Sequence, residues 1–427
     1  MNRVFLGLFG VAFAVAAWHQ LTDAPPIPLA DGTVPLTAME SLSKDMMAGA
    51  KGAVDLAIGL IGPMTLFLGL MKVAEAGGLM AILGNALRPL LVLVFPRVPA
   101  HHPAMGAMVL NFSANALGLG NAATPFGIRA MNELQKLNRH KDTATNAMIT
   151  FLAINMSHIT LLPTGVIGVR AAMGSNDPAG VLPTTLFATA CSATTAIILS
   201  LLASRWTEDP GAQDDDSVDA EAAQSVPWPL WQSLAVLGGI MICIPLTVTF
   251  GKVMSPWMIP IIAMLLLGFG AARGVPVYEA FVEGAKDGFQ VAIRITPFVV
   301  GILTAVAMFK SSGALSLFTA AVGPLTAPLG LPAEALPMVI IRPLSGSGAL
   351  AVMMGIMQEH GVDSYVGYLV GTINGCTETI FYTMAVYFGA VGIQKTRHLL
   401  AIALFAELGG VIGAVIATKT YLGLWGG

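Results

Sequence analysis

The sequence predicts an all-α polytopic membrane protein built from two related halves with broken or re-entrant helices. Three observations predict this fold class. Of the 427 residues, 55% are hydrophobic and 11% are charged, with a mean hydropathy of +0.76; soluble domains carry about 25% charged residues. One acidic segment divides the chain, and similar blocks follow in the same order on both sides of it. Finally, polar and glycine-rich breaks interrupt apolar runs, which a lipid-facing helix does not tolerate.

Several apolar runs approach the roughly 20 residues that a membrane-spanning helix needs. The clearest are Val4–Trp18, Leu182–Ala203, Leu230–Phe250, Trp257–Ala272, Pro297–Phe309 and Leu399–Ala417. The first run, with Arg3 before it, has features of a signal peptide. No convincing small-residue cleavage site precedes His19, so an uncleaved first helix is the favoured interpretation.

The acidic segment Ser204–Pro229 divides the chain into a first membrane half, residues 1–203, and a second, residues 230–427. It contains no Leu, Ile or Phe, which predicts a flexible linker. Arg205 and Arg273 flank the linker and the hairpin that follows it. Because Lys and Arg near helix ends favour the cytoplasmic side, we expect the linker to be cytoplasmic and disordered.

The two halves contain matched blocks, which indicates an internal repeat. "GAK" occurs at 49–51 and again at 284–286, and an apolar stretch follows each copy. Further on, "INMSHITLLPT" at 154–164 aligns with "INGCTETIFYT" at 373–383. Other aligned pairs are Pro63 with Pro297, Gly77–Leu79 with Gly313–Leu315, Pro89 with Pro324, and Thr164 with Thr383.

Loop charges predict that the repeats are inverted. Between the matched blocks the first half has the basic loop "NELQKLNRHKD", whereas the second half has "MQEHGVDSY", without Lys or Arg. After the second block the bias reverses, with "MGSNDPAG" in the first half and "IQKTRH" in the second. Opposite charge bias in equivalent loops is typical of inverted-topology repeats. Coincidence in short loops is the alternative.

Long motifs in both halves resemble known families. The stretches "HPAMGAMVLNFSANALGLGNAATPFGIRAMNELQKLN" and "MITFLAINMSHITLLPTGVIGVR" resemble spore maturation protein A. Three others resemble spore maturation protein B: "VPVYEAFVEGAKDGFQVAIRITPFVVGILTAVAMFKSSGAL", "LPMVIIRPLSGSGAL" and "FYTMAVYFGAVGIQKTRHLL". The chain therefore resembles a natural fusion of the two, over nearly everything except the linker and the extreme N-terminus.

This resemblance implies the nucleoside recognition, or gate, domain group. The group is similar to segments of concentrative nucleoside transporters and to the membrane part of the ferrous iron transporter. The resemblance thus implies two gate-type repeats with a transport-like fold in a bacterial inner (plasma) membrane, and it implies no particular substrate.

The first polar break is "NFSANALGLGNAATPFG" (Asn111–Gly127), which we expect to be a broken or re-entrant element facing a cavity. Its amides can donate and accept hydrogen bonds, which suits a neutral polar or zwitterionic ligand. Packing between helices through small residues and Asn is the alternative. The candidate binding residues here are Asn111, Ser113, Asn115, Asn121 and Thr124.

The second half has its own break, "IIRPLSGSGAL", with Arg342, Ser345 and Ser347 as candidate binding residues. An arginine within an apolar region is costly and indicates a functional site by default. Backbone amides at the Ser/Gly break could receive an anion. Extension of the Arg342 side chain to the membrane interface is the alternative.

The aligned blocks add a third cluster of polar side chains. Glu378, flanked by apolar runs, is the best candidate for proton or cation coupling, with Arg342 as a potential partner. His158 lies in the matching neighbourhood and is the second coupling candidate, although a structural hydrogen bond is the commoner role of a lone buried His. The binding candidates here are Asn155, Ser157, Thr160, Asn374, Thr377, Glu378 and Thr379.

Several functions lack support in the sequence. The net charge of −3 offers no basic surface for nucleic acid, and Cys191, Cys243 and Cys376 are too far apart to indicate a zinc site or a disulfide framework. His101 and His102 have no third ligand nearby, so we expect no metal site. No nucleophile, metalloprotease or P-loop motif is present, so we expect neither an enzyme nor a cofactor.

The leading hypothesis is a transporter-like protein that binds or moves a small polar solute at a mid-membrane site between the repeats. The alternative is a structural or regulatory membrane protein of envelope or spore maturation that does not transport. The expected partners are the lipid bilayer and the unknown solute. The spacing of Gly409 and Gly413 would also permit close helix contact in a homodimer.

Overall fold

The computed structural model describes residues 2–22, 36–118, 123–207 and 229–424. Within these residues the chain is helical, and the only strand-like feature is an isolated bridge between Thr143 and Lys395. The first half contains α1 (Asn2–Thr22), α2 (Ala38–Gly59), α3 (Ile61–Ala76), α4 (Leu79–Val94), α5 (Pro103–Ala116), α6 (Thr124–Lys136), α7 (Asn146–Met156), α8 (Thr164–Ala172) and α9 (Val181–Trp206). The second half contains α10 (Leu230–Ala272), α11 (Val277–Ser311), α12 (Ala314–Thr326), α13 (Leu336–Ile341), α14 (Gly346–His360), α15 (Tyr365–Cys376), α16 (Ile380–Val391) and α17 (Leu399–Leu424).

Four of the described helical stretches are long and apolar enough to cross a membrane. They are Ala38–Ala76, Pro178–Trp206, Val277–Ser311 and Leu399–Leu424. The apolar runs predicted the second and the fourth. They missed the first, because lysines and aspartates in α2 interrupt its apolar pattern, and they recovered only the end of the third. The predicted runs 230–250 and 257–272 are joined in α10.

All four polar segments predicted from the sequence interrupt helices. The breaks separate α5 from α6, α7 from α8, α13 from α14, and α15 from α16. The helices α5 and α6 pack against each other, as do α13 and α14, so each of these pairs forms a helical hairpin. Residues 119–122, which include Asn121, lie outside the described residues, as do most of the predicted linker residues, 208–228.

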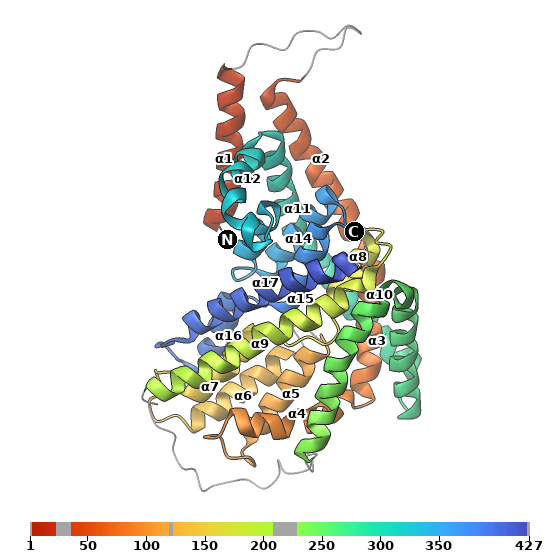
Figure 1. Ribbon diagram of the computed structural model, residues 1–427, viewed down its shortest axis with the longest axis vertical. Helices are drawn as coiled ribbons and strands as arrows, with labels where there is room; N and C mark the ends of the chain where they lie inside the picture. The colour runs from red at the N-terminus through yellow and green to blue at the C-terminus, as the bar shows by residue number, and fades with distance from the viewer. Residues whose placement is uncertain (1, 23–35, 119–122, 208–228, 425–427) are drawn as a thin grey trace.

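The last helices of the two halves, α9 and α17, lie side by side (Figure 1). Tyr421, near the end of α17, donates a hydrogen bond to Asp177, just before α9 begins. The two helices are therefore antiparallel. Gly409 and Gly413 face α9, because a Cβ at Gly409 would lie 2.6 Å from Thr195 Oγ1. This glycine spacing thus serves a contact within the chain.

The connecting loops show that the two repeats are inverted. The basic loop of the first half pairs with the basic loop of the second, since the backbone amides of Gln394 and Lys395 both donate to Asp142 O at 2.9 Å. At the other end of α17, Asp363 of the second half accepts a hydrogen bond from the Asn176 amide at 2.8 Å. Equivalent loops of the two halves therefore lie at opposite ends of the molecule.

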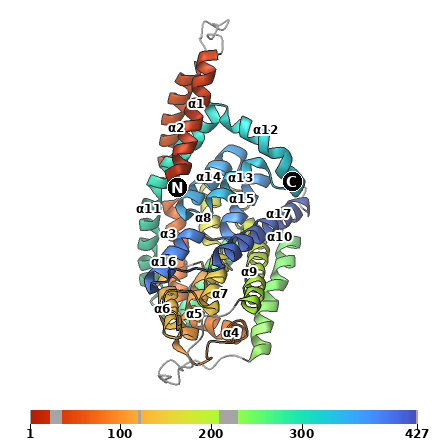
Figure 2. The same cartoon turned by 90° about the vertical axis from the view of Figure 1, so that its left-hand side faces the viewer.

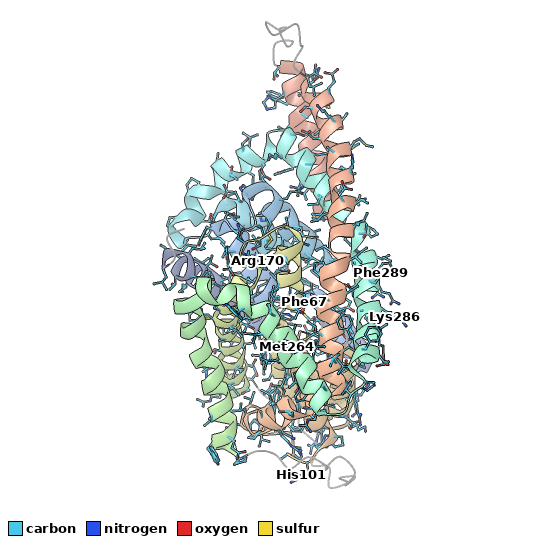
Figure 3. The ribbon with its side chains drawn as sticks, turned by 90° about the vertical axis from the view of Figure 1, so that its right-hand side faces the viewer. Phe67, His101, Arg170, Met264, Lys286 and Phe289 are labelled. Atoms are coloured by element: carbon cyan, nitrogen blue, oxygen red, sulfur yellow. The ribbon has the colours of Figure 1, made fainter. Side chains whose placement is uncertain are left out.

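The two halves meet along a shared core. Phe67 and Val166 of the first half belong to one buried apolar cluster with Val299, Met353 and Leu369 of the second. The helix α11 packs against both α2 and α3, whereas α1 and the start of α2 extend beyond the rest of the molecule at one end (Figure 2). The outer side of α11 carries Lys286 and Phe289, which point away from the molecule (Figure 3).

Glycines from the repeated "GAK" motifs allow the close approach of these helices. A Cβ at Gly284 would lie 2.5 Å from Leu68 O of α3, and one at Gly49 would lie 2.8 Å from Ala307 Cβ of α11. The same motif therefore makes the cross-half contact in each repeat. Gly78 and Gly313 both have a positive φ just before a helix begins, so the structure aligns Gly78 with Gly313. The sequence alignment, which paired Gly77 with Gly313, was therefore displaced by one residue.

Candidate functional site

A cavity of about 610 Å³ lies between the two halves, where the helix breaks meet. This volume is within the range of small-molecule sites, roughly 300–1,000 Å³. Its polar and ionisable lining residues are Asn115, Thr124, Asn155, His158, Arg294, Ser345, Ser347, Glu378, Thr379, Tyr382, Thr383 and Tyr387. Every break contributes at least one of them. Asn115 of the first half and Glu378 of the second therefore line the same cavity.

Backbone hydrogen bonds join the breaks to one another. The Leu161 amide donates to Ala116 O at 2.8 Å, which connects the two breaks of the first half. The Glu378 amide donates to Met156 O at 3.2 Å, and the Ile380 amide donates to Pro343 O at 3.0 Å. Because unpaired backbone groups are costly in a membrane interior, these bonds explain how the breaks are stable there.

Gly118 is needed where two breaks come together. Its φ is +71°, and a Cβ there would lie 2.6 Å from Leu162 O. A side chain would therefore be excluded by the backbone conformation and by the neighbouring chain. This close approach brings the end of α5 to the segment that follows α7.

The two cavity asparagines of the first half bind each other. The Asn115 side-chain amide donates to Asn155 Oδ1 at 2.9 Å, and the Asn155 amide donates to Phe151 O at 2.8 Å. Asn155 is thereby fixed on α7, and Asn115 is fixed to Asn155. The pair presents a fixed polar surface to the cavity, contributed by two different helix breaks.

The amino end of α14 forms the opposite polar wall. Ser345 has an extended backbone conformation and caps the helix, since its hydroxyl accepts the Gly348 amide at 3.0 Å. Ser347 lies in the first turn of this helix and also lines the cavity. The first backbone N–H groups of a helix carry a partial positive charge, so this wall favours acceptor or anionic groups.

Glu378 is held by ionic and hydrogen-bond partners from both halves. Its Oε2 lies 3.0 Å from Nδ1 of His158, and its Oε1 lies 3.7 Å from Nη1 of Arg342. The Thr379 backbone amide and hydroxyl also donate to Oε1, at 2.9 and 3.0 Å. The Glu378 side chain nevertheless keeps 30% of its surface exposed to the cavity. The structure thus joins both predicted coupling residues in one pair.

The buried side chain of Arg342 contacts Glu378 and the backbone next to it. This side chain is only 5% exposed, which excludes extension to the membrane interface. It donates through Nε to Thr377 Oγ1 at 3.2 Å and through Nη2 to Asn374 O at 3.1 Å, as well as to Thr377 O. Arg342 therefore satisfies the unwound backbone after α15 and places a positive charge next to Glu378.

Other predicted site residues lie behind the cavity wall. Asn111 is fully buried and donates to Ala123 O at 2.9 Å across the first break, and Ser113 and Ser157 donate to carbonyls of their own helices. Thr160 is also buried. The residues that do not line the cavity are Asn111, Ser113, Ser157, Thr160, Arg342, Asn374 and Thr377.

The sequence interpretation missed four polar lining residues, Arg294, Tyr382, Thr383 and Tyr387. Arg294 was overlooked because the apolar run was taken to begin at Pro297, whereas α11 begins at Val277 and has Arg294 at its centre. The rule that singled out Arg342 would have found Arg294 as well. Thr383 was aligned with Thr164 but was not nominated.

These features define a class of protein: a multi-pass helical membrane protein with a polar cavity at the broken helices of two inverted repeats. Comparison with known proteins agrees. The "Gate: Nucleoside recognition" family model matches residues 57–173. The chain is 42% identical to spore maturation protein B of Bacillus subtilis (strain 168), over 39% of this chain and 93% of that protein.

The chain is also 44% identical to spore maturation protein A of the same organism, over 38% of this chain and 82% of that protein. A solved structure of CNTnw in an outward-facing state matches the whole of both chains with a TM-score of 0.47 and 13% identity. The extent and identity of the two relatives show that the chain belongs to the family of spore maturation proteins A and B, as a fusion of both.

Proposed function

We propose that this protein is a carrier that binds a small polar solute in the cavity and moves it across a bacterial inner membrane. The observation that supports this proposal most is the convergence of all four helix breaks on one cavity. Broken helices at the interface of inverted repeats are the usual position of substrate and ion sites in secondary transporters. The lining residues would bind the solute, and the cavity would have no catalytic role.

The pairing of His158 with Glu378 supports a role in coupling. One member of the pair comes from each repeat, and the two atoms are 3.0 Å apart. A relative movement of the repeats would separate the imidazole from the carboxylate and leave each group without this partner. The pair therefore provides a route by which solute movement and proton movement could be linked.

A second candidate function is supported by the names of the two relatives. A membrane protein of spore or envelope maturation could have kept this fold without transport, and then the cavity would have no solute. The size and polarity of the cavity favour the carrier, since a purely structural protein gains stability by filling its centre with apolar side chains.

The deciding experiment is a binding screen on the purified full chain. Nucleosides, amino acids, peptidoglycan precursors and metal ions would be tested for thermal stabilisation, and hits would be tested for uptake into proteoliposomes. The carrier proposal expects a compound that raises the unfolding temperature and is transported. Stabilisation without uptake would support a regulatory receptor instead, and the absence of any hit together with a cavity closed to water would refute a solute site.

A further inference from the structure

Arg294 places a charge at the centre of a membrane-spanning helix. It is the middle residue of α11 (Val277–Ser311), it lines the main cavity, and it also lines the more open space beside it, together with Thr124 and Tyr382. Among the residues that the structure describes, none forms an ion pair with it. An arginine at this depth is costly unless an anion or water compensates its charge.

Glu378 does not neutralise the charge of Arg294. Within the described lining, the ionisable side chains other than the tyrosines are His158, Arg294 and Glu378. Glu378 already has Arg342 at 3.7 Å and His158 at 3.0 Å. The charge of Glu378 is therefore balanced inside the wall, and the cavity keeps the positive charge of Arg294 for a ligand.

Apolar side chains line the same cavity as Arg294, whose own side chain is exposed. Ile295 and Phe298 follow on α11, and Leu344 and Leu350 face the cavity near the start of α14. The amino end of α14, with Ser345 and Ser347, adds a second electropositive element. A ligand that matches this wall has an anionic group for Arg294 and an apolar body for the side chains around it.

We propose that the solute is a water-soluble organic anion, with a carboxylate or phosphate bound by Arg294 and by the amino end of α14. This inference rests on the proposed function and makes it more specific. The asparagine pair Asn115–Asn155 binds the polar end of the solute. The positive charge of Arg294 excludes organic cations.

The charge of the cavity can be measured without knowing the solute. Ser347→Cys is introduced into a full-length chain whose native cysteines Cys191, Cys243 and Cys376 are replaced by alanine. Two methanethiosulfonate reagents of similar size are compared, the anionic sulfonatoethyl and the cationic trimethylammonioethyl compound. Each rate is divided by the rate of the same reagent with a free small thiol, which removes the difference in intrinsic reactivity.

The expected result is that the anionic reagent reacts at least about tenfold faster than the cationic one after this correction, since a charged cleft concentrates counter-ions by about this factor or more. Arg294→Gln should abolish the preference, and Arg294→Lys should retain most of it. A ratio near one, or a preference that survives in Arg294→Gln, would overturn the anion assignment. If the new cysteine reacts with neither reagent, the cavity is closed to water and the solute site itself is refuted.

A matched ligand pair gives an independent measurement. Nicotinate and nicotinamide have the same ring and differ in a carboxylate or a neutral amide, and each is tested for protection of the cysteine at 347. Protection by nicotinate at a concentration at least tenfold below that of nicotinamide supports the inference. Equal or better protection by nicotinamide would contradict it while leaving a solute site in place.

Discussion

Two buried arginines form ion pairs, one between the halves and one within the second half, and their surroundings differ. Arg170 of α8 (Figure 3) is fully buried and pairs with Asp363, with 2.8 Å between Nη2 and Oδ1. Arg342 pairs with Glu378 at 3.7 Å. Arg170 also donates to Val362 O at 2.8 Å and lies 3.9 Å from the centre of the Tyr368 ring. Asp363, the partner of Arg170, connects two loops, whereas Glu378, the partner of Arg342, faces the cavity.

The network of Arg170, Ser175, Asp177 and Asp363 is a structural contact, which we call the clamp. The surroundings of Glu378 form the candidate binding site. Around Arg170, polar groups bind one another: Ser175 donates to Asp363 at 2.6 Å, and the Tyr368 and Tyr421 hydroxyls both donate to Asp177 at 2.8 Å. A network of this kind holds one end of the molecule together. Around Glu378, part of the side-chain surface remains open to the cavity, so Glu378 is available to a solute there, whereas Asp363 does not line that cavity.

The largest expected effect concerns which ends of the molecule lie on which side of the membrane. Lys141, in the basic loop of the first half, and Asn176, in the loop before α9, are exposed and suit labelling. We expect Lys141→Cys to react with an impermeant thiol reagent only from the cytoplasmic side, and Asn176→Cys only from the opposite side. Reaction of both from one side would contradict the inverted repeats and the separation of the two ends.

The next largest effect is the loss of the clamp. Arg170→Met leaves Asp363 without its buried partner, and breaking a buried pair typically costs about 3–5 kcal/mol. We expect a strongly lowered unfolding temperature and a low yield of inserted protein. The exposed Arg129→Met is the matched control and should unfold at the temperature of the unmodified protein. A clamp variant as stable as this control would show that the network is not structural.

Glu378→Gln should weaken solute binding and leave the stability of the fold largely unchanged, the reverse of what we expect for Arg170→Met. It preserves the shape but weakens the contacts with His158 and Arg342 that fix this part of the cavity wall, so we expect solute affinity to fall at least about tenfold, or roughly 1.4 kcal/mol. The unfolding temperature should change far less than in Arg170→Met. Glu279→Gln, at an exposed position on α11, is the control for a loss of charge alone. Unchanged binding in Glu378→Gln would remove Glu378 from the site.

Asn115→Leu should have a smaller effect on the fold while abolishing transport. Asn155 would lose the hydrogen bond from Asn115, and an unsatisfied polar group costs about 1–3 kcal/mol. Asn85→Leu is a matched change at a half-buried asparagine outside the cavity. Uptake into proteoliposomes should be lost only in the first variant. Equal uptake in both would make the Asn115–Asn155 pair a packing contact.

The smallest effect is expected at the exposed loop pairing. Hydrogen bonds from Lys395 and Thr143 lower the pKa of the Asp142 carboxyl below its ordinary value of 3.8. A lowered folded-state pKa means that the contribution of the ionised carboxyl to stability is present above that ordinary value and is lost as the pH falls through the folded-state pKa. We therefore expect Asp142→Asn to lower the unfolding temperature only slightly at neutral pH, because the pair is exposed to solvent, and to have no effect below the folded-state pKa. A large destabilisation at neutral pH would mean that both ends of the molecule are clamped.

Much of the fold could be predicted from the sequence, because its signals are local. Apolar length predicted two of the four spanning stretches and the end of a third, and the polar segments at 111–127, 154–164, 342–348 and 373–383 marked all four breaks. Opposite loop charges predicted the inversion. The span Ala38–Ala76 was missed because Lys44, Asp45 and Lys51 interrupt its apolar pattern, although α2 packs against α11.

The candidate site was less accessible to sequence reasoning, because it depends on which side of each break faces inward. Spacing alone does not distinguish Asn115, which lines the cavity, from Asn111, one helical turn earlier, which closes the break through Ala123. Arg170 was not singled out, because its partner Asp363 lies in the other half of the chain. The assignments of the linker and of Asn121 remain predictions.

The separation of clamp and site is tested most directly by measuring how much a ligand stabilises three proteins. The ligand is the strongest stabiliser from the binding screen, and the proteins are the unmodified chain, Asp363→Asn and Glu378→Gln. We predict that Asp363→Asn unfolds at a lower temperature but gains as many degrees from the ligand as the unmodified chain does. We predict that Glu378→Gln gains almost none. An equal gain in Glu378→Gln, or a gain lost in Asp363→Asn, would contradict the account.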